Sequence, residues 1–388
     1  MRGSTFLAWA WLRAHPGRSL LVAGCTALIL LLPLALGVFV ARYAETLGAR
    51  AAATPLVLGA PGSRFDLVLA ALHFRGRPRT TLPWSMLERV AADPDVEAVP
   101  LHVGHTARGA PVVGTSPDYH RLRGLVALEG TLPLRLGEAT VGAALARSAG
   151  LAPGQRLLVD AAGLFQFGLR QPLALRVVGV LAPTGTADDA AVFVDVKTCW
   201  VLDGLGHLHA DPAQADPSQV LARDGPRGTV LAPSVVEATE ISPANEAQFH
   251  LHGDPATRPL SAVLVVPRDA RAATIVKGRY RGDPAAQVLD PAEVTEELLG
   301  TVFRIKAFFD AHLLLVGTAT GLLLGLVVLL TLRVRAGELA TLARLGASRA
   351  FVARMLATEW LVLLGAGALG ALALGGVLLQ TLLPGLLP

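Results

Sequence analysis

The chain has 388 residues, of which 52% are hydrophobic and 16% charged, and its formal net charge is +4. This composition excludes a disordered chain and indicates either a membrane protein or a very apolar globular one. The positions of the apolar residues favour the membrane protein, because three uncharged stretches reach the roughly 20 residues that cross a bilayer.

The predicted transmembrane helices cover residues 19–40, 313–332 and 361–383. A secretory signal would have a shorter apolar core of about 7–15 residues, so the first stretch is interpreted as a retained anchor. Arginines precede it in residues 1–18 and separate the other two in residues 333–354. Basic residues mark the cytoplasmic side. The sequence therefore predicts a cytoplasmic N-terminus and an outer region at 41–310.

The outer region is large enough for one or two domains. Strand patterns and short amphipathic helices alternate in it, which predicts an α-helical membrane protein with a large α+β extracytoplasmic domain. Residues 204–227 are rich in Gly, Pro, Asp and Ala and are expected to form a loop or a junction between subdomains. The expected strands are 56–58, 65–69, 96–103, 111–115, 154–159, 173–181, 191–194 and 261–266, and the expected helices are 83–92 and 138–148.

The outer region is expected to end in a helix that leads into the second span. Asp290 suits its N-cap, Pro291 its first position and Glu293 its third. Apolar residues then recur every three or four positions as far as Phe309. A helix at each end of the outer region would form a stalk that transmits movement, although a simple packed helix has the same spacing.

The remaining composition constrains the partners. Cys25 lies in the first span and Cys199 in the outer region, so no intrachain disulfide is expected. Arginines that set the topology account for the positive charge, and no nucleic-acid partner is expected. The glycines of the third span permit close helix packing, either within the subunit or against a second copy. They are residues 365, 367, 370, 375 and 376.

The cytoplasmic loop 333–354 contains a predicted short helix. Leu339, Leu342 and Leu345 recur at a spacing of three, Gly346 suits a C-terminal cap, and Ser348 can cap the next helix. Such a helix on the inner surface fits a groove on a soluble partner, or it rests on lipid.

Three segments resemble parts of MacB/FtsX-type ABC transporter permeases, which carry a MacB-like periplasmic core domain. They are residues 59–69, 177–186 and, most specifically, 337–349. One N-terminal span, a large outer domain and clustered C-terminal spans also follow the order of that family. The family usually has a fourth span, so this chain is expected to be a three-span variant, with a truncated product as the alternative.

The resemblance implies a permease subunit in the bacterial inner membrane. It would couple ATP hydrolysis by a separate cytoplasmic ABC ATPase to periplasmic work, such as export, extraction or mechanotransmission. Further implied partners are a second permease copy or a homologous permease, a periplasmic adaptor or binding protein, and membrane lipid. The implied ATPase-docking residues of this coupling helix are Glu338, Leu339, Leu342, Arg344, Leu345 and Gly346.

The chain is expected to bind no ATP itself. It contains no Gly-x-x-x-x-Gly-Lys-Ser/Thr phosphate loop, and its lysines are Lys197, Lys277 and Lys306 alone. We therefore expect a non-catalytic subunit without a cofactor, with ATP on the partner. A hydrolase in the outer region is disfavoured because Gly-x-Ser-x-Gly is absent.

Two His-x-His pairs suggest an alternative, a zinc-linked ABC system. Alternate residues of a strand share a face, so His207 with His209 and His250 with His252 could offer imidazoles to zinc or copper. Surface histidines are the plainer interpretation, and His102 and His105 offer a weaker version of the same pattern. A membrane-anchored sensor or regulator of a periplasmic partner is the other alternative.

Overall fold

The computed structural model describes residues 2–76, 79–160, 173–208, 220–224, 228–231, 241, 245–246 and 249–386. The chain divides into two compact units. The first contains residues up to Thr46 and those from Leu299 onward, and the second extends from Leu47 to Leu298.

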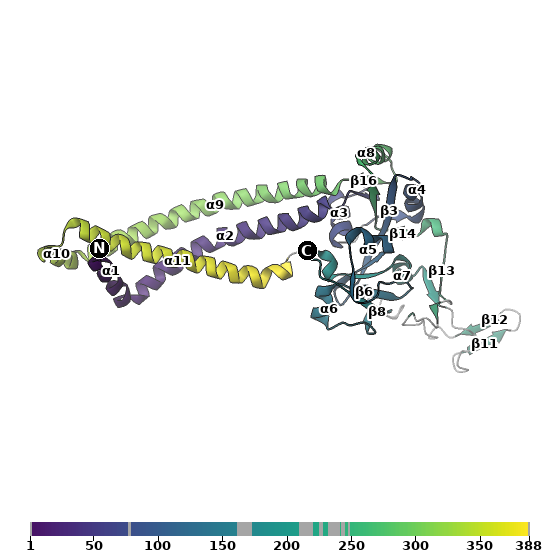
Figure 1. Ribbon diagram of the computed structural model, residues 1–388, viewed down its shortest axis with the longest axis horizontal. Helices are drawn as coiled ribbons and strands as arrows, with labels where there is room; N and C mark the ends of the chain where they lie inside the picture. The colour runs from purple at the N-terminus through teal and green to yellow at the C-terminus, as the bar shows by residue number, and fades with distance from the viewer. Residues whose placement is uncertain are drawn as a thin grey trace. The chain divides into compact units, whose positions relative to one another are not determined.

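The first unit is built from helices. Among the described residues, three helices are long and apolar enough to cross a membrane by length and composition. They include the predicted spans, so the expectation of three long apolar helices is confirmed. Figure 1 shows them beside one another, with two short helices near one end. The helices are α1 (Arg2–Ala14), α2 (Pro16–Ala52), α9 (Pro291–Val334), α10 (Ala336–Arg344) and α11 (Arg349–Leu386).

Small residues let α11 pack closely on α2. A Cβ atom on Gly367 would lie 2.6 Å from the carbonyl oxygen of Ala23 and 2.6 Å from Cβ of Thr26, so only glycine fits at this crossing. Ala371, one turn further along, is fully buried. At these positions the small residues of the third apolar helix serve packing within the subunit.

The second unit is organised around a ten-stranded sheet. Neighbouring strands are antiparallel except for the pairs β4–β9 and β6–β8. In spatial order the strands are β16 (Gln287–Leu289), β1 (Leu56–Gly59), β15 (Ala262–Pro267), β3 (Val96–Ala107), β4 (Ala110–Thr115), β9 (Val192–Asp195), β6 (Glu138–Val141), β8 (Ala174–Leu181) and β5 (Ala127–Gly130), and β7 (Arg156–Leu158) also pairs with β8. Three smaller pairs are β10 (Gly206–Leu208) with β13 (Phe249–Leu251), β11 (Val220–Asp224) with β12 (Gly228–Leu231), and β14 (Pro259–Leu260) with β2 (Leu82–Pro83).

Both faces of the central strands are buried, because helices cover the sheet on two sides. Val57 of β1 packs in one core with residues of α3, whereas its neighbours Leu56 and Leu58 pack in another with residues of α4. This division follows the two-residue period of a strand. The observed mixture confirms the predicted α+β class. The helices of the second unit are α3 (Arg64–His73), α4 (Trp84–Ala91), α5 (Pro117–Arg123), α6 (Ala143–Ala149), α7 (Val196–Leu202) and α8 (Ala270–Arg279).

Two expected elements are wrong. Residues 65–69 were expected as a strand but belong to α3, whose first turn is capped by Ser63: the Asp66 N–H donates to its hydroxyl at 3.2 Å. Phe65, Val68, Leu69 and Leu72 also have helical spacing. The helix expected at 138–148 is instead strand β6 followed by α6.

Most other expected elements are confirmed within a few residues, including the helix start at Asp290. The Ala292 N–H donates to the Asp290 carboxylate at 3.1 Å, as an N-cap requires. The junction expected at 204–227 includes residues 209–219 and 225–227, which lie outside the described part of the chain.

Both cysteines are free thiols. Cys25 is exposed on α2, whereas Cys199 is fully buried beside Gly114, where a Cβ atom would lie 2.6 Å from its sulfur. Burial, together with the negative charges of Asp203 and Asp195, raises the pKa of the Cys199 thiol.

A buried ion pair holds the end of α2 in the second unit. The Arg50 guanidinium donates to both oxygens of the Asp188 carboxylate at 2.8 and 2.9 Å, and to the carbonyl oxygen of Leu72. The Tyr119 hydroxyl donates to Asp188 at 2.7 Å. Burial raises the pKa of Asp188, but the hydrogen bond and charge of Arg50 outweigh burial, and the net pKa is lowered.

Arg50→Met should destabilise the second unit by about 3–5 kcal/mol, because it leaves a buried carboxylate without its counter-charge. Tyr119→Phe should have a smaller effect of about 1–3 kcal/mol, since it removes one hydrogen bond to that carboxylate. Urea unfolding of the full chain would measure both. Equal effects of the two substitutions, or none, would contradict the assignment of Arg50 as the principal partner.

Candidate functional site

The predicted docking segment forms a helix with defined ends. Only Arg335 separates α9 from α10, and Gly346 follows α10 with a φ of +90°, a conformation that favours glycine. The Phe351 N–H donates to the hydroxyl of Ser348 at 3.2 Å, which caps α11. The predicted helix, turn and second helix are therefore confirmed, while the docking role stays a prediction.

The six predicted docking residues are brought together on α10 and the following turn, but they differ in exposure. Leu345 is 80% exposed, and Glu338, Arg344 and Gly346 are exposed as well. Leu339 and Leu342 are half-buried. The expected row of three leucines is therefore uneven, and Leu345 is the residue that presents the most apolar surface.

A buried ion pair beside this helix was missed by sequence reasoning. Arg335 donates to the two oxygens of the Glu359 carboxylate on α11 at 2.7 and 3.3 Å, and to Glu338 at 3.3 Å. The Arg335 and Glu359 side chains are only 6% and 3% exposed. Arg335 lies in the stretch 333–354, whose arginines were interpreted as setting the topology. The feature of the sequence that could have indicated this pair is Glu359, an acidic residue two positions before the third apolar stretch.

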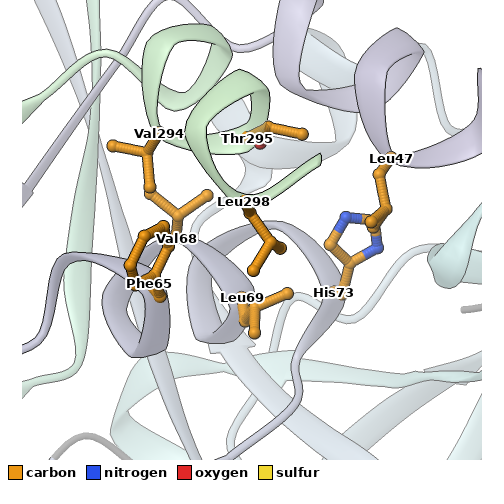
Figure 2. A pocket seen from close by; sticks show the side chains of 8 residues that line it. All are labelled: Leu47, Phe65, Val68, Leu69, His73, Val294, Thr295 and Leu298. Atoms are coloured by element: carbon orange, nitrogen blue, oxygen red, sulfur yellow. The ribbon is translucent and has the colours of Figure 1, made fainter. Parts of the chain in front are cut away.

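The second unit contains an apolar pocket where α2 and α9 meet α3 (Figure 2). It is small, with room for a water-sized molecule. In Figure 2, residues of α9 face α3 across the space, and His73 lies beside Leu47. The lining residues are Leu47, Phe65, Val68, Leu69, His73, Val294, Thr295 and Leu298.

His73 is the titratable group of this pocket. Its side chain is buried, and its Nδ1 atom has no hydrogen-bond partner. Burial is the main cause that lowers the pKa of His73 to about 4, and the charges of Arg50, Arg75 and Arg123 add to it. The imidazole is therefore neutral in the folded unit at physiological pH.

The histidine pairs are only partly described. Strands β10 and β13 pair so that His207 lies opposite His250, while His209 lies outside the described residues. The rings of His250 and His252 lie 4.6 Å apart. Across the described ranges, no group of three or more His, Cys, Asp or Glu side chains could hold a metal ion.

His102 and His105 share one carboxylate. Their Nε2 atoms lie 2.7 and 2.9 Å from the two oxygens of Asp203. The register of β3 shifts between Val103 and His105, and this bulge brings both histidines to the same side of the strand. Burial raises the pKa of Asp203, but the hydrogen bonds from the histidines outweigh burial and lower it. Asp203 is therefore an ionised hydrogen-bond acceptor.

The described chain thus combines three long apolar helices, a short helix between two of them in the sequence, and an α+β unit. Residues 21–241, over half of the chain, match the family described as the MacB-like periplasmic core domain. The chain belongs to this family, that of the MacB/FtsX-type permeases. No curated protein matches the chain significantly.

Two solved structures show low similarity to the chain. The periplasmic region of MacB from Actinobacillus actinomycetemcomitans is 9% identical, with a TM-score of 0.36, and the comparison covers 63% of this chain and 92% of that one. The extracellular domain of the noncanonic ABC-type transporter YknZ from Gram-positive bacteria is 14% identical, with a TM-score of 0.34, over 60% of this chain and 98% of that one.

The stability of the second unit should depend on pH through His73. Its pKa is about 4 when folded and about 6.5 when unfolded, so the unfolded chain binds the proton first as the pH falls. The free energy of unfolding is therefore unaffected by His73 above a pH of about 6.5. It falls as the pH is lowered towards 4, by up to roughly 3 kcal/mol. His73→Leu should flatten this part of the profile, as measured by urea unfolding across that pH range. Parallel profiles for the two proteins would contradict the assignment.

Proposed function

We propose that this chain is the permease subunit that couples ATP hydrolysis by a separate ABC ATPase to conformational work at the periplasmic face. The observation that carries the proposal is the short helix α10, which lies in the chain between two long apolar helices and is followed directly by the exposed Leu345. Membership of the permease family supports the ATPase partner. The sequence contains no phosphate loop, which supports the proposal that ATP binds to that partner.

In this proposal α1, α10 and the N-terminus lie in the cytoplasm of a bacterial cell, the three apolar helices cross the inner membrane, and the unit from Leu47 to Leu298 is periplasmic. The arginines of residues 1–18 and 333–354 support this orientation. A second permease copy, or a homologous one, would complete the membrane assembly, and a periplasmic adaptor or binding protein would act with the outer unit.

Two helices provide the proposed path for movement. Both α2 and α9 continue without a loop through the positions at which the two units divide. Hydrogen bonds along the helix axis make each helix a stiff element. In the second unit, Arg50 anchors the end of α2, and Val294 and Thr295 at the start of α9 are buried. Closure of the ATPase would move the helices as a rigid-body switch, and the outer unit would perform export, extraction or mechanotransmission.

Leu345→Asp should abolish docking of the ATPase, because it places a charge on the exposed apolar side chain that directly follows α10. We expect at least about thirtyfold weaker association, the size of an interface hot spot. The measurement is recovery of the ATPase with affinity-purified permease from membranes. Leu342→Asp is a less clean test, since Leu342 is half-buried and its replacement would also disturb packing.

Leu158→Asp is the matched control, because it makes the same change at a leucine that is 56% exposed in the second unit. It should leave recovery of the ATPase unchanged. Normal recovery with Leu345→Asp would refute docking through α10. If the wild-type chain recovers a kinase or a transcription regulator in place of an ATPase, the proposal fails. That result would support the alternative of a membrane-anchored sensor.

A further inference from the structure

Arg335 connects three helices of the first unit through one guanidinium group. It is the single residue between α9 and α10, and it donates to Glu359 on α11 and to Glu338 on α10. Its guanidinium carbon also lies 4.2 Å from the centre of the Trp11 ring on α1. The face of an aromatic ring attracts a cation, so Trp11 covers the pair and stabilises its positive member.

The helix that carries Trp11 is itself fixed on α11. Ala8 and Leu12, on the same face of α1, are buried, and Gly3 lies against the ring of Phe351. His15 stacks on Trp11 with ring centres 4.6 Å apart. Trp11 therefore has a defined position, and Arg335 is enclosed by α1 on one side and α11 on the other.

Burial separates Arg335 from the surface that a partner would contact. Arg335 is buried, whereas Leu345 is 80% exposed. Because a buried charge needs its partner, displacing α10 from α11 would leave Arg335 or Glu359 unpaired. The pair thus resists the relative movement of these helices and leaves the outer face of α10 free.

We infer that Arg335 is a positioning residue that fixes α10 on α11, so that a force applied to α10 moves α11 with it. The inference rests on the proposed function, in which α10 receives the ATPase. It adds that docking and force transmission reside in different residues: the exposed side chains of α10 bind the partner, and the buried pair Arg335–Glu359 transmits its movement.

Two measurements on the full chain in lipid nanodiscs test this inference. The first is hydrogen exchange of the α10 amides in the permease alone, for Arg335→Gln, Glu359→Gln and the charge swap that combines Arg335→Glu with Glu359→Arg. We expect faster exchange in both single variants and partial recovery in the swap, which restores the pair but places a carboxylate against Trp11. Arg333→Gln is the matched control, because Arg333 is exposed and only two positions away.

The second measurement uses the permease with its co-purified ATPase. Hydrogen exchange of residues 349–358, at the start of α11, is compared with and without ATP and vanadate, which trap the closed ATPase. In Arg335→Gln the ATPase should still be recovered at the wild-type level, while the response at 349–358 falls at least about fivefold, a change typical of lost coupling between sites. A loss of stability alone would not leave docking intact while removing this response.

The outcomes separate the two proposals. Unchanged exchange in α10 of both single variants would overturn the inference, as would loss of ATPase recovery in Arg335→Gln, which would make Arg335 a docking residue. If the wild-type chain recovers no ATPase, the proposed function fails, and the exchange of α10 in the permease alone decides whether Arg335 fixes this helix.

Discussion

The Asp188 carboxylate accepts hydrogen bonds from Arg50 and Tyr119 in the interior of the second unit, and the position of α2 there follows from this contact. Arg50 also bonds the carbonyl oxygen of Leu72 at the end of α3. A single network therefore holds the end of α2, the Tyr119 side chain and the end of α3. Ionised groups in such a place must be fully paired, because each unpaired charge is strongly destabilising. The pocket lined by residues of α2, α3 and α9 lies next to this network, because Leu47 and His73 of its lining are close in the chain to Arg50 and Leu72.

A similar arrangement occurs in the first unit. Arg335 follows the end of α9 and pairs with Glu359, as Arg50 near the end of α2 pairs with Asp188. In both places a cation lies near the C-terminus of a long helix, where the helix dipole favours positive charge. Buried pairs of this kind add little stability over apolar groups of the same size, but they tolerate little displacement. The two pairs thus define the geometry at these two helix ends.

The parts of the fold that were predictable depend on local patterns. The three apolar stretches, the capped α10 and the Asp290 helix start all follow from spacing or from side chains that bond their own neighbours. The parts that were not predictable depend on contacts across the chain. Nothing near Arg335 in the sequence shows that Glu359 is its partner. A strand period of two places His102 and His105 on opposite faces, and only the bulge between them brings both to Asp203. The helix α3 was missed because its apolar residues fit a strand over the short segment considered.

The packing of Cys199 beneath Gly114 protects its thiol from reaction for as long as the second unit stays folded. The thiol is fully buried and its pKa is raised, so it is neither reached by oxidants nor converted to the reactive thiolate while the unit is folded. In an oxidising compartment a permanently exposed thiol would be modified, whereas this one stays reduced for as long as β4 and α7 remain together. A modified Cys199 in a recovered molecule would therefore indicate that β4 and α7 had separated in the second unit.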